Sequence, residues 1–258
     1  MFKNFIKIAL RNIIRHKSYV FINVLGLSIG IACSILIVLF VLQELSYDKF
    51  NKNFKRIYRV YLSGKIGTSE ISGAWTAAPT AGAFIQDFPE VEDAVRMQNW
   101  GEVVVKVEDR SFIEKRFMIA DSSFFNIFSI PLLQGDPETA LNKPHTVVIT
   151  RKTAKKYFGN EDPVGKMIKV NTDTTHFTVT GIIDEVPVNT HFEFDLLASF
   201  LTHERANDDF WLSNSFLTYI LLNEGTNADE LEGKIPALLE KYIGPQLLEV
   251  LGITLEEF

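Results

Sequence analysis

The stretch that decides how this chain is organised is Val20–Leu42, VFINVLGLSIGIACSILIVLFVL, which contains no charged residue. As a helix with a rise of 1.5 Å per residue it would be ~35 Å long, against ~30 Å for the hydrocarbon core of a bilayer. Buried helices of soluble proteins rarely stay apolar on every face over such a length. The sequence therefore predicts a transmembrane helix at residues 19–43.

A cleaved signal peptide is the main alternative for an apolar stretch near the N-terminus. Its apolar core should be about 7–15 residues long and should end at small residues before a cleavage site. This stretch is longer, and Gln43 and Glu44 follow it. Gly30–Cys33 (GIAC) is similar to a lipoprotein cleavage box, but cleavage there would leave a long apolar end. We expect the helix to be retained.

The distribution of charge predicts the orientation of this helix. The first 43 residues carry five Lys or Arg and no acid, whereas the rest carries all 32 acids against 21 bases. Cytoplasmic flanks collect Lys and Arg. We therefore expect an inner-membrane protein with a cytoplasmic N-terminus and residues 44–258 in the periplasm. The acidic body has no basic stripe, which argues against nucleic-acid binding.

Residues 1–18 have a helical pattern of their own. Apolar residues recur at helical spacing, and basic residues recur every four positions on a neighbouring face. This predicts an amphipathic helix on the inner leaflet whose basic side faces lipid headgroups. A generic positively charged flank explains the pattern equally well. The apolar set is Phe2, Ile6, Ala9 and Ile13, and the basic face is Lys3, Lys7, Arg11 and Arg15.

Small residues mark one face of the predicted transmembrane helix. Gly26 and Gly30 form a G-x-x-x-G pattern, and Ser34 extends it by one turn. Small residues let transmembrane helices approach closely, although this pattern is common by chance. If the face packs against a helix, that helix belongs to another segment or another chain. The sequence thus gives weak support for a homodimer or a paired permease.

The body, residues 44–258, reads as α+β with mixed sheets and flanking helices. Alternation of apolar and polar residues, clearest at Phe177–Ile183, indicates strands. We expect the last helix to be weakened or split at Pro236. The expected strands are 56–62, 91–97, 102–107, 112–119, 146–149, 177–183, 192–199 and 216–222, and the expected helices are 79–87, 122–128, 151–158 and 228–242.

Phe158–Met167, FGNEDPVGKM, is similar to a phosphate-binding loop. That loop requires four residues between its glycines and a Ser or Thr after the lysine. Here five residues separate Gly159 from Gly165, and Met167 takes the hydroxyl position. The stretch is better explained as a turn after a helix, with Gly159 as the C-terminal cap.

Residue types that can take part in catalysis or metal binding form one cluster in the sequence. His191, Glu193 and Asp195 alternate, so on a strand they would share a face. They could form a metal or acid–base site, or the polar face of a half-buried strand whose Phe192 and Phe194 point inward. We expect the second arrangement, and we expect a protein that is not an enzyme and has no cofactor. The single cysteine, Cys33, excludes an internal disulfide.

Short stretches along most of the chain resemble MacB/FtsX-type ABC transporter permeases, specifically their N-terminal helix and MacB-like periplasmic core domain. Each stretch is modest, and their order and extent make the resemblance specific. The stretches are Ala9–Asn12, Leu25–Gly30, Tyr47–Phe50, Arg56–Val60, Asp87–Val91, Ala120–Phe125, Gly135–Leu141, Ala154–Gly159, Pro163–Lys166 and Val179–Gly181.

The resemblance implies a permease whose membrane helices pass conformational change to a periplasmic domain. ATP would be hydrolysed by a separate cytoplasmic ABC ATPase subunit. The periplasmic domain would then drive release or efflux of a substrate already outside the inner membrane, and a periplasmic or outer-membrane partner could assist it. Members of the family supply no catalytic residues to transfer to this sequence.

The family has further transmembrane helices after this domain, so the resemblance implies that the sequence is the front part of a longer permease. The alternative is a single-pass, membrane-anchored binding or sensor domain that signals through its helix. A membrane-anchored enzyme using His191, Glu193 and Asp195 is a third hypothesis. A metal bound by the purified domain would favour it.

Overall fold

The computed structural model describes residues 2–66, 69–171 and 175–257. The chain divides into two compact units at the Tyr47–Asp48 bond. The predicted boundaries at residues 18 and 43 are those between the membrane-surface helix, the transmembrane helix and the body. These boundaries stay predictions. Each unit has a physical basis of its own and is described separately.

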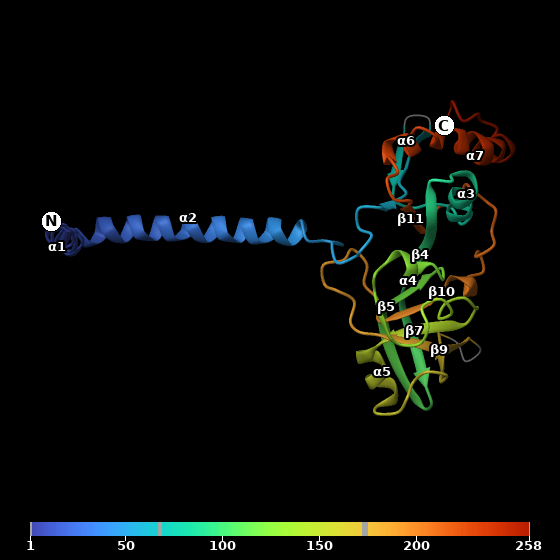
Figure 1. Ribbon diagram of the computed structural model, residues 1–258, viewed down its shortest axis with the longest axis horizontal. Coiled ribbons are helices and arrows are strands. Elements are labelled where there is room, and N and C mark those ends of the chain that lie inside the picture. The colour runs from blue at the N-terminus through green and yellow to red at the C-terminus, as the bar shows by residue number, and fades with distance from the viewer. Residues whose placement is uncertain (1, 67–68, 172–174, 258) are drawn as a thin grey trace. The chain divides into compact units, whose positions relative to one another are not determined.

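The N-terminal unit consists of α1 (Phe2–Arg15) and α2 (Lys17–Glu44), which meet at His16 (Figure 1). None of the described residues of α2 is buried, and Leu27, Leu36 and Phe40 each expose more than 60% of their surface. The most apolar 18 residues of this helix have a mean hydropathy of 2.8, and exposing such a surface to water is unfavourable. By length and composition α2 can cross a membrane, and it is the one such helix in the described residues.

The second unit is built on a mixed sheet. Its path runs β1–β11–β4–β5–β10–β7–β9–β6. The pairs β5–β10 and β7–β9 are parallel, and the other pairs on this path are antiparallel. The strands are β1 (Ile57–Arg59), β4 (Val91–Val107), β5 (Arg110–Ala120), β6 (Leu132–Gln134), β7 (Thr146–Thr150), β8 (Met167–Val170), β9 (His176–Ile183), β10 (Leu196–Ser199) and β11 (Leu217–Leu222).

Strand β8 closes part of this sheet into a ring. It pairs with β9 on one side and with the end of β4 on the other. The pairings β4–β5–β10–β7–β9–β8 therefore return to β4, and we call this set the strand ring. Its interior contains fully buried side chains from every one of these strands, including Val105, Phe117, Val147, Ile168 and Val179. Each of these strands therefore has a neighbouring strand on both sides over part of its length.

A bend in β4 makes the closure possible. The pairing of β4 with β5 shifts register on both sides of Gly101, which has a φ of +74°. Asn99 Oδ1 accepts a hydrogen bond of 2.7 Å from the Gly101 backbone N–H. Such bulges bend a strand and increase its twist. The first part of β4 consequently pairs with β11, whereas its last residues pair with β8.

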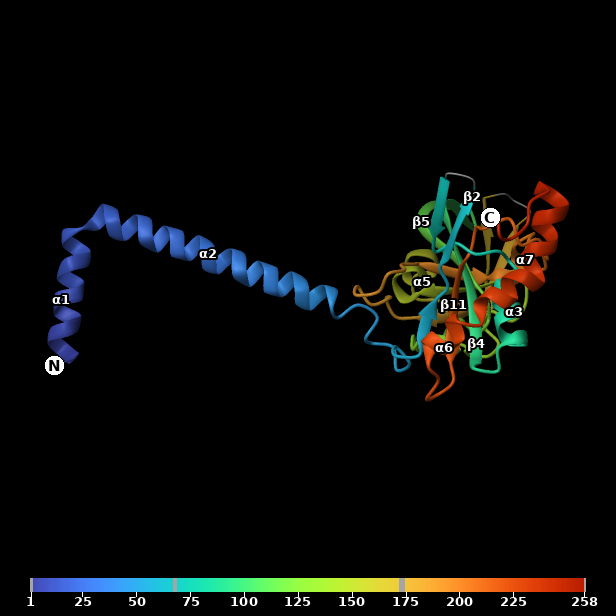
Figure 2. The same cartoon turned by 90° about the horizontal axis from the view of Figure 1, so that it is seen from above.

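Helices cover the sheet at both ends of the unit (Figures 1 and 2). Short α5 (Arg151–Phe158) contributes Tyr157 to the interior of the strand ring. At the other end, α3 (Thr80–Asp87), α6 (Ala228–Glu232) and α7 (Ile235–Leu251) pack around Phe84 and Leu247 against β4 and β11. We call β1, β11, residues 91–100 and these three helices the open half. The short helix α4 (Phe124–Ile127) packs on the opposite sheet face in an aromatic cluster.

The predicted α+β fold with mixed sheets and one N-terminal apolar helix is confirmed. Some expectations were wrong in detail, and short strands, β6 and β8 among them, were not predicted. Strands 91–97 and 102–107 are one bent strand, because Gly101 forms a bulge and not a turn. Residues 192–195 precede β10 and are not part of it. The hairpin β2 (Leu62–Ile66) and β3 (Ser69–Gly73) was not predicted, because its glycines and serines weaken the strand pattern.

Two expectations about helix ends and turns are confirmed. The last helix is split: α6 ends at Glu232, and α7 begins at Ile235 with Pro236 in its first turn, where proline is tolerated. Gly159 caps α5 with a φ of +64°, and Asp162 Oδ1 accepts from the Val164 N–H in the following turn. The stretch that is similar to a phosphate loop is therefore a helix cap and turn.

Candidate functional site

The small residues predicted to pack against another helix lie one turn apart on α2. A Cβ added at Gly26 or Gly30 would meet no atom within 4 Å, so this face has room for a neighbouring helix. Ser34 Oγ donates a 2.8 Å hydrogen bond to the Gly30 carbonyl, which satisfies the hydroxyl inside the helix. The face offers close contact without an unpaired polar group. Its partner stays a prediction.

The predicted basic face of α1 is exposed along its whole length. Lys3, Lys7, Arg11 and Arg15 are all exposed, and Arg15 lies in the last turn, where a cation interacts favourably with the helix dipole. Apolar Ile6 and others share the exposed surface of this helix. An exposed helix that carries both kinds of side chain fits a membrane surface. Binding of lipid by these residues stays a prediction.

The structure separates the three polar residues that the sequence grouped. His191 Nδ1 lies 2.6 Å from Asp48 Oδ2, and its Nε2 hydrogen-bonds the Tyr219 hydroxyl. Glu193 and Asp195 instead bind Arg116, at 3.3 and 2.8 Å. The bidentate contact with Asp195 raises the pKa of the Arg116 guanidinium.

As expected, Phe192 and Phe194, which alternate with these three polar residues, point inward and are buried. In the described residues no three His, Cys, Asp or Glu side chains are placed to hold a metal ion.

His191 belongs to a network that fixes the start of the body. The Asp48 N–H donates to the Asn189 carbonyl at 2.8 Å, so residue 48 is tied to the segment that carries His191. Buried Asn51 donates to the Asp48 carbonyl and accepts from the Ser129 N–H. Burial raises the pKa of the Tyr219 phenol to about 12, so this hydroxyl stays protonated and available as a donor. The network therefore holds Asp48 and Asn51 in place at the start of the body.

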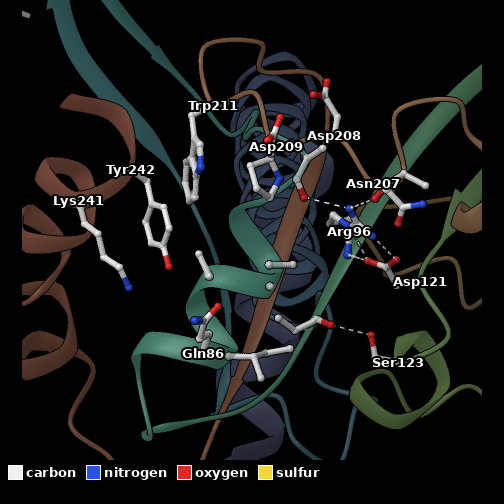
Figure 3. A pocket seen from close by; sticks show the side chains of 18 of the residues that line it. Gln86, Arg96, Asp121, Ser123, Asn207, Asp208, Asp209, Trp211, Lys241 and Tyr242 are labelled. Atoms are coloured by element: carbon white, nitrogen blue, oxygen red, sulfur yellow. Dashed lines mark hydrogen bonds and ion pairs between the residues drawn. The ribbon is translucent and has the colours of Figure 1, made fainter. Parts of the chain in front are cut away.

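A groove of about 860 Å³ lies in the open half, between α3, the start of β4 and α7 (Figure 3). Arg96 and Asp121 lie on one side of it, and Trp211, Tyr242 and Lys241 lie on the other.

Several polar groups of this groove are hydrogen-bonded within the body. Arg96 binds Asp121 through two nitrogens at 2.9 Å and also donates to the carbonyls of Ala78 and Ala206. Ser123 Oγ donates to the Ala94 carbonyl, and Lys241 binds Asp87. Tyr242 also donates to Asp87, at 3.4 Å. These interactions hold the polar side chains on both sides of the groove in place.

A smaller apolar cavity of about 280 Å³ lies beside the groove and shares Trp211 with it. Leu238, Leu239 and Ile243 of α7 line one wall, and Trp75 lies at another with 57% of its surface exposed. The sequence gave no indication of either cavity. The residues that line them come from segments as far apart as 60 and 246, and no local pattern connects such segments.

Comparisons with known proteins agree on the body of the chain. The sequence model of the MacB-like periplasmic core domain matches residues 20–238. No curated protein sequence matches the chain.

Among solved structures, a domain of a protein named as a permease, from Porphyromonas gingivalis, is 21% identical with a TM-score of 0.68. The match covers 74% of this chain and 83% of that one. This likeness shows that the two share a fold.

Two further structures are more distant. The periplasmic region of MacB from Actinobacillus actinomycetemcomitans is 16% identical with a TM-score of 0.49, covering 65% of this chain and 74% of that one. The extracellular domain of the noncanonic ABC-type transporter YknZ from Gram-positive bacteria is 14% identical with a TM-score of 0.45. That match covers 70% of this chain and 86% of the other.

Proposed function

This chain belongs to the family of proteins with a MacB-like periplasmic core domain, and from that premise we propose that it is the N-terminal part of an ABC exporter permease. In this proposal a separate cytoplasmic ATPase hydrolyses ATP, α2 crosses the inner membrane, and the body works in the periplasm on a substrate to be released or exported. The observation that carries the proposal is the family match, which begins inside the apolar helix and continues through the body.

The geometry of the body favours a protein that transmits movement over one that catalyses a reaction. The strand ring is a closed, densely packed unit. The network around Asp48 ties the first residues after the N-terminal unit to Tyr219 of β11 and to the segment that leads into β10 of the ring. Packed cores move as rigid bodies and do not deform continuously. A displacement applied at residue 48 would therefore reach the sheet through β11 and through the segment before β10. We propose that the protein is not an enzyme and acts through such movement.

Copurification tests the ATPase partner. The protein would be tagged in its native host and extracted from membranes in mild detergent, and the coeluting proteins would be identified by mass spectrometry. We expect an ABC ATPase subunit. The matched variant reverses two charges of the basic face, Arg11→Glu with Arg15→Glu, and should recover less ATPase if α1 faces the cytoplasmic partner. Recovery of the protein without any ATPase would contradict the permease and favour the single-pass sensor.

Thiol labelling in intact cells tests the orientation. In a Cys33→Ser background, one cysteine replaces Ile8 on α1 and another replaces Ile113 in the body, both exposed positions. A reagent that crosses the outer membrane but not the inner membrane should label position 113 before lysis and position 8 only after lysis. The reverse order would place the body in the cytoplasm and would end the proposal.

A further inference from the structure

The first residues of the body must lie near the surface of any membrane that α2 spans. A chain advances at most ~3.6 Å per residue, so Lys49 lies within ~18 Å of the end of α2 at Glu44. This step rests on the proposed function, because it takes α2 as a transmembrane helix. It depends only on chain connectivity and not on how the two units are arranged.

This segment carries cations that the body does not neutralise. Lys49, Lys52 and Lys55 are exposed and three residues apart, in a run of consecutive turns. In the part of the chain that the structure describes, none of the three has an acidic partner within ion-pair distance. Three lysines without an acidic partner thus lie within seven residues, in a body whose acids outnumber its bases, and Lys55 Nζ lies 5.8 Å from the centroid of the Phe54 ring.

Several neighbouring acids already have partners. Asp48 binds His191 at 2.6 Å, and Glu92 binds Arg56 at 2.5 Å. Glu193, on the segment beside Asp48, binds Arg116 at 3.3 Å. Each of these carboxylates is therefore directed to His191, Arg56 or Arg116 and not to one of the three lysines.

Two apolar side chains accompany the lysines. Phe54 exposes 40% of its surface, and Val188 exposes 89%. The hydrogen bond from the Asp48 N–H to the Asn189 carbonyl holds the segment of Val188 next to the lysine segment. Basic side chains beside exposed apolar ones are typical of surfaces that lie at the headgroup level of a bilayer.

We propose that Lys49, Lys52, Phe54, Lys55 and Val188 form a lipid-binding patch that docks on a membrane surface containing anionic phospholipids. The ammonium groups attract headgroup phosphates, and Phe54 and Val188 enter the interface between headgroups and acyl chains. Covalent attachment to α2 keeps the patch near the bilayer, so weak individual contacts add up. The patch gives the body an attachment to lipid in addition to α2.

Fluorescence quenching in nanodiscs tests the patch on the full chain. Val188→Cys in a Cys33→Ser background carries an environment-sensitive dye, and the nanodiscs contain lipids with a quencher at the headgroup. One set of discs mixes phosphatidylglycerol with phosphatidylcholine, and the other contains phosphatidylcholine alone. We expect quenching at position 188 several-fold stronger in the anionic discs, and weak quenching in both sets for a dye at Ile113→Cys, a position 63% exposed on β5.

Matched charge variants isolate the role of the lysines. Lys49→Gln, Lys52→Gln and Lys55→Gln combined should reduce quenching at position 188 to the level of position 113. Lys115→Gln, Lys152→Gln and Lys169→Gln remove the same charge from exposed positions outside the patch and should leave quenching unchanged. Circular dichroism of each variant confirms that the fold is intact.

The outcomes separate this proposal from the one on which it rests. A dye on native Cys33 should be quenched by acyl-chain quenchers if α2 spans the bilayer. Quenching at Cys33 without quenching at position 188 would overturn the patch alone. Equal quenching at position 188 in both kinds of disc, unaffected by the triple variant, would also overturn it, because it would show nearness without recognition of anionic lipid. No quenching at Cys33 would remove both proposals.

Discussion

The strand ring and the open half share strand β4, but they differ in whether their strands have neighbours on both sides. In the ring every strand has a neighbour on each side, and Phe117, Ile119 and Ile149 are fully buried. In the open half β1 is a sheet edge of three residues, and both cavities lie against α7.

The difference shows where rigidity and adaptability lie in the molecule. A closed set of strands with a dense core resists deformation. A short edge strand and helices packed beside cavities have fewer contacts to lose, so they open locally at lower cost. We therefore expect the ring to transmit movement and the open half to respond to partners.

The largest expected effect comes from emptying the ring core. Phe117 stacks on Trp100 with centroids 5.4 Å apart and contacts the ring of Phe177 edge-on. Phe117→Ala should lower the free energy of unfolding by about 3–5 kcal/mol. Urea denaturation followed by far-ultraviolet circular dichroism measures it.

The matched change in the open half is Trp211→Ala, which removes a stacking partner of Tyr242. Since Trp211 already borders two cavities, we expect about 2–3 kcal/mol. Hydrogen exchange should speed up in α7 and stay slow in β5 and β7. Equal loss of protection in both halves would show that they are one cooperative unit and would break the comparison.

A smaller effect is expected at the buried carboxylate of the ring. Glu114 accepts hydrogen bonds from the Tyr157 hydroxyl at 2.7 Å and from Lys156 at 2.6 Å. Glu114→Ala should cost about 1–3 kcal/mol, because it leaves the buried hydroxyl without an acceptor. Adding Tyr157→Phe should recover part of this loss. A double variant that is as unstable as the sum of the two single variants would show that the hydroxyl is satisfied elsewhere.

Two substitutions of glycine by alanine, one in the bulge of β4 and one in α3, test whether the bulge needs its glycine. A Cβ at Gly101 would meet no atom, so Gly101→Ala adds only backbone strain and should cost about 1–2 kcal/mol. Gly82→Ala in α3, where space is also open, should instead stabilise by up to about 1 kcal/mol. Thermal melting of the two variants measures both. A neutral Gly101→Ala would show that the bend in β4 does not need its left-handed residue.

The smallest expected effect is a pH dependence at the boundary of the halves. His203 packs against Phe200 and Phe216, and burial lowers the pKa of its imidazole. A lowered pKa means that the unfolded chain binds more protons, so the stability from neutral His203 is present above the ordinary imidazole pKa of about 6.5 and is lost as the pH falls below it. His203→Asn should have a flatter dependence of melting temperature on pH. An unchanged slope would assign the effect to other groups.

Local patterns predicted some elements and failed at others for identifiable reasons. Helix α5 and strand β9 were predicted within a residue of their bounds, because a helix cap and an alternating pattern depend only on residues that are adjacent in the sequence. Residues 98–101 were taken as a break between two strands, since a bulge and a turn have the same local signal. His191 and Glu193 share an exposed face, but their partners Asp48 and Arg116 are 143 and 77 residues away.

The sequence alone determined the apolar helix, the mixed α and β composition of the body and the family to which the chain belongs. These properties follow from sums and patterns over neighbouring residues, which no distant contact changes. Only the tertiary structure decided that β8 closes the strand ring, that the polar cluster splits between two partners, and that two cavities border Trp211. Strand pairing joins residues that are far apart in sequence, and the packing energy of the whole core selects its register.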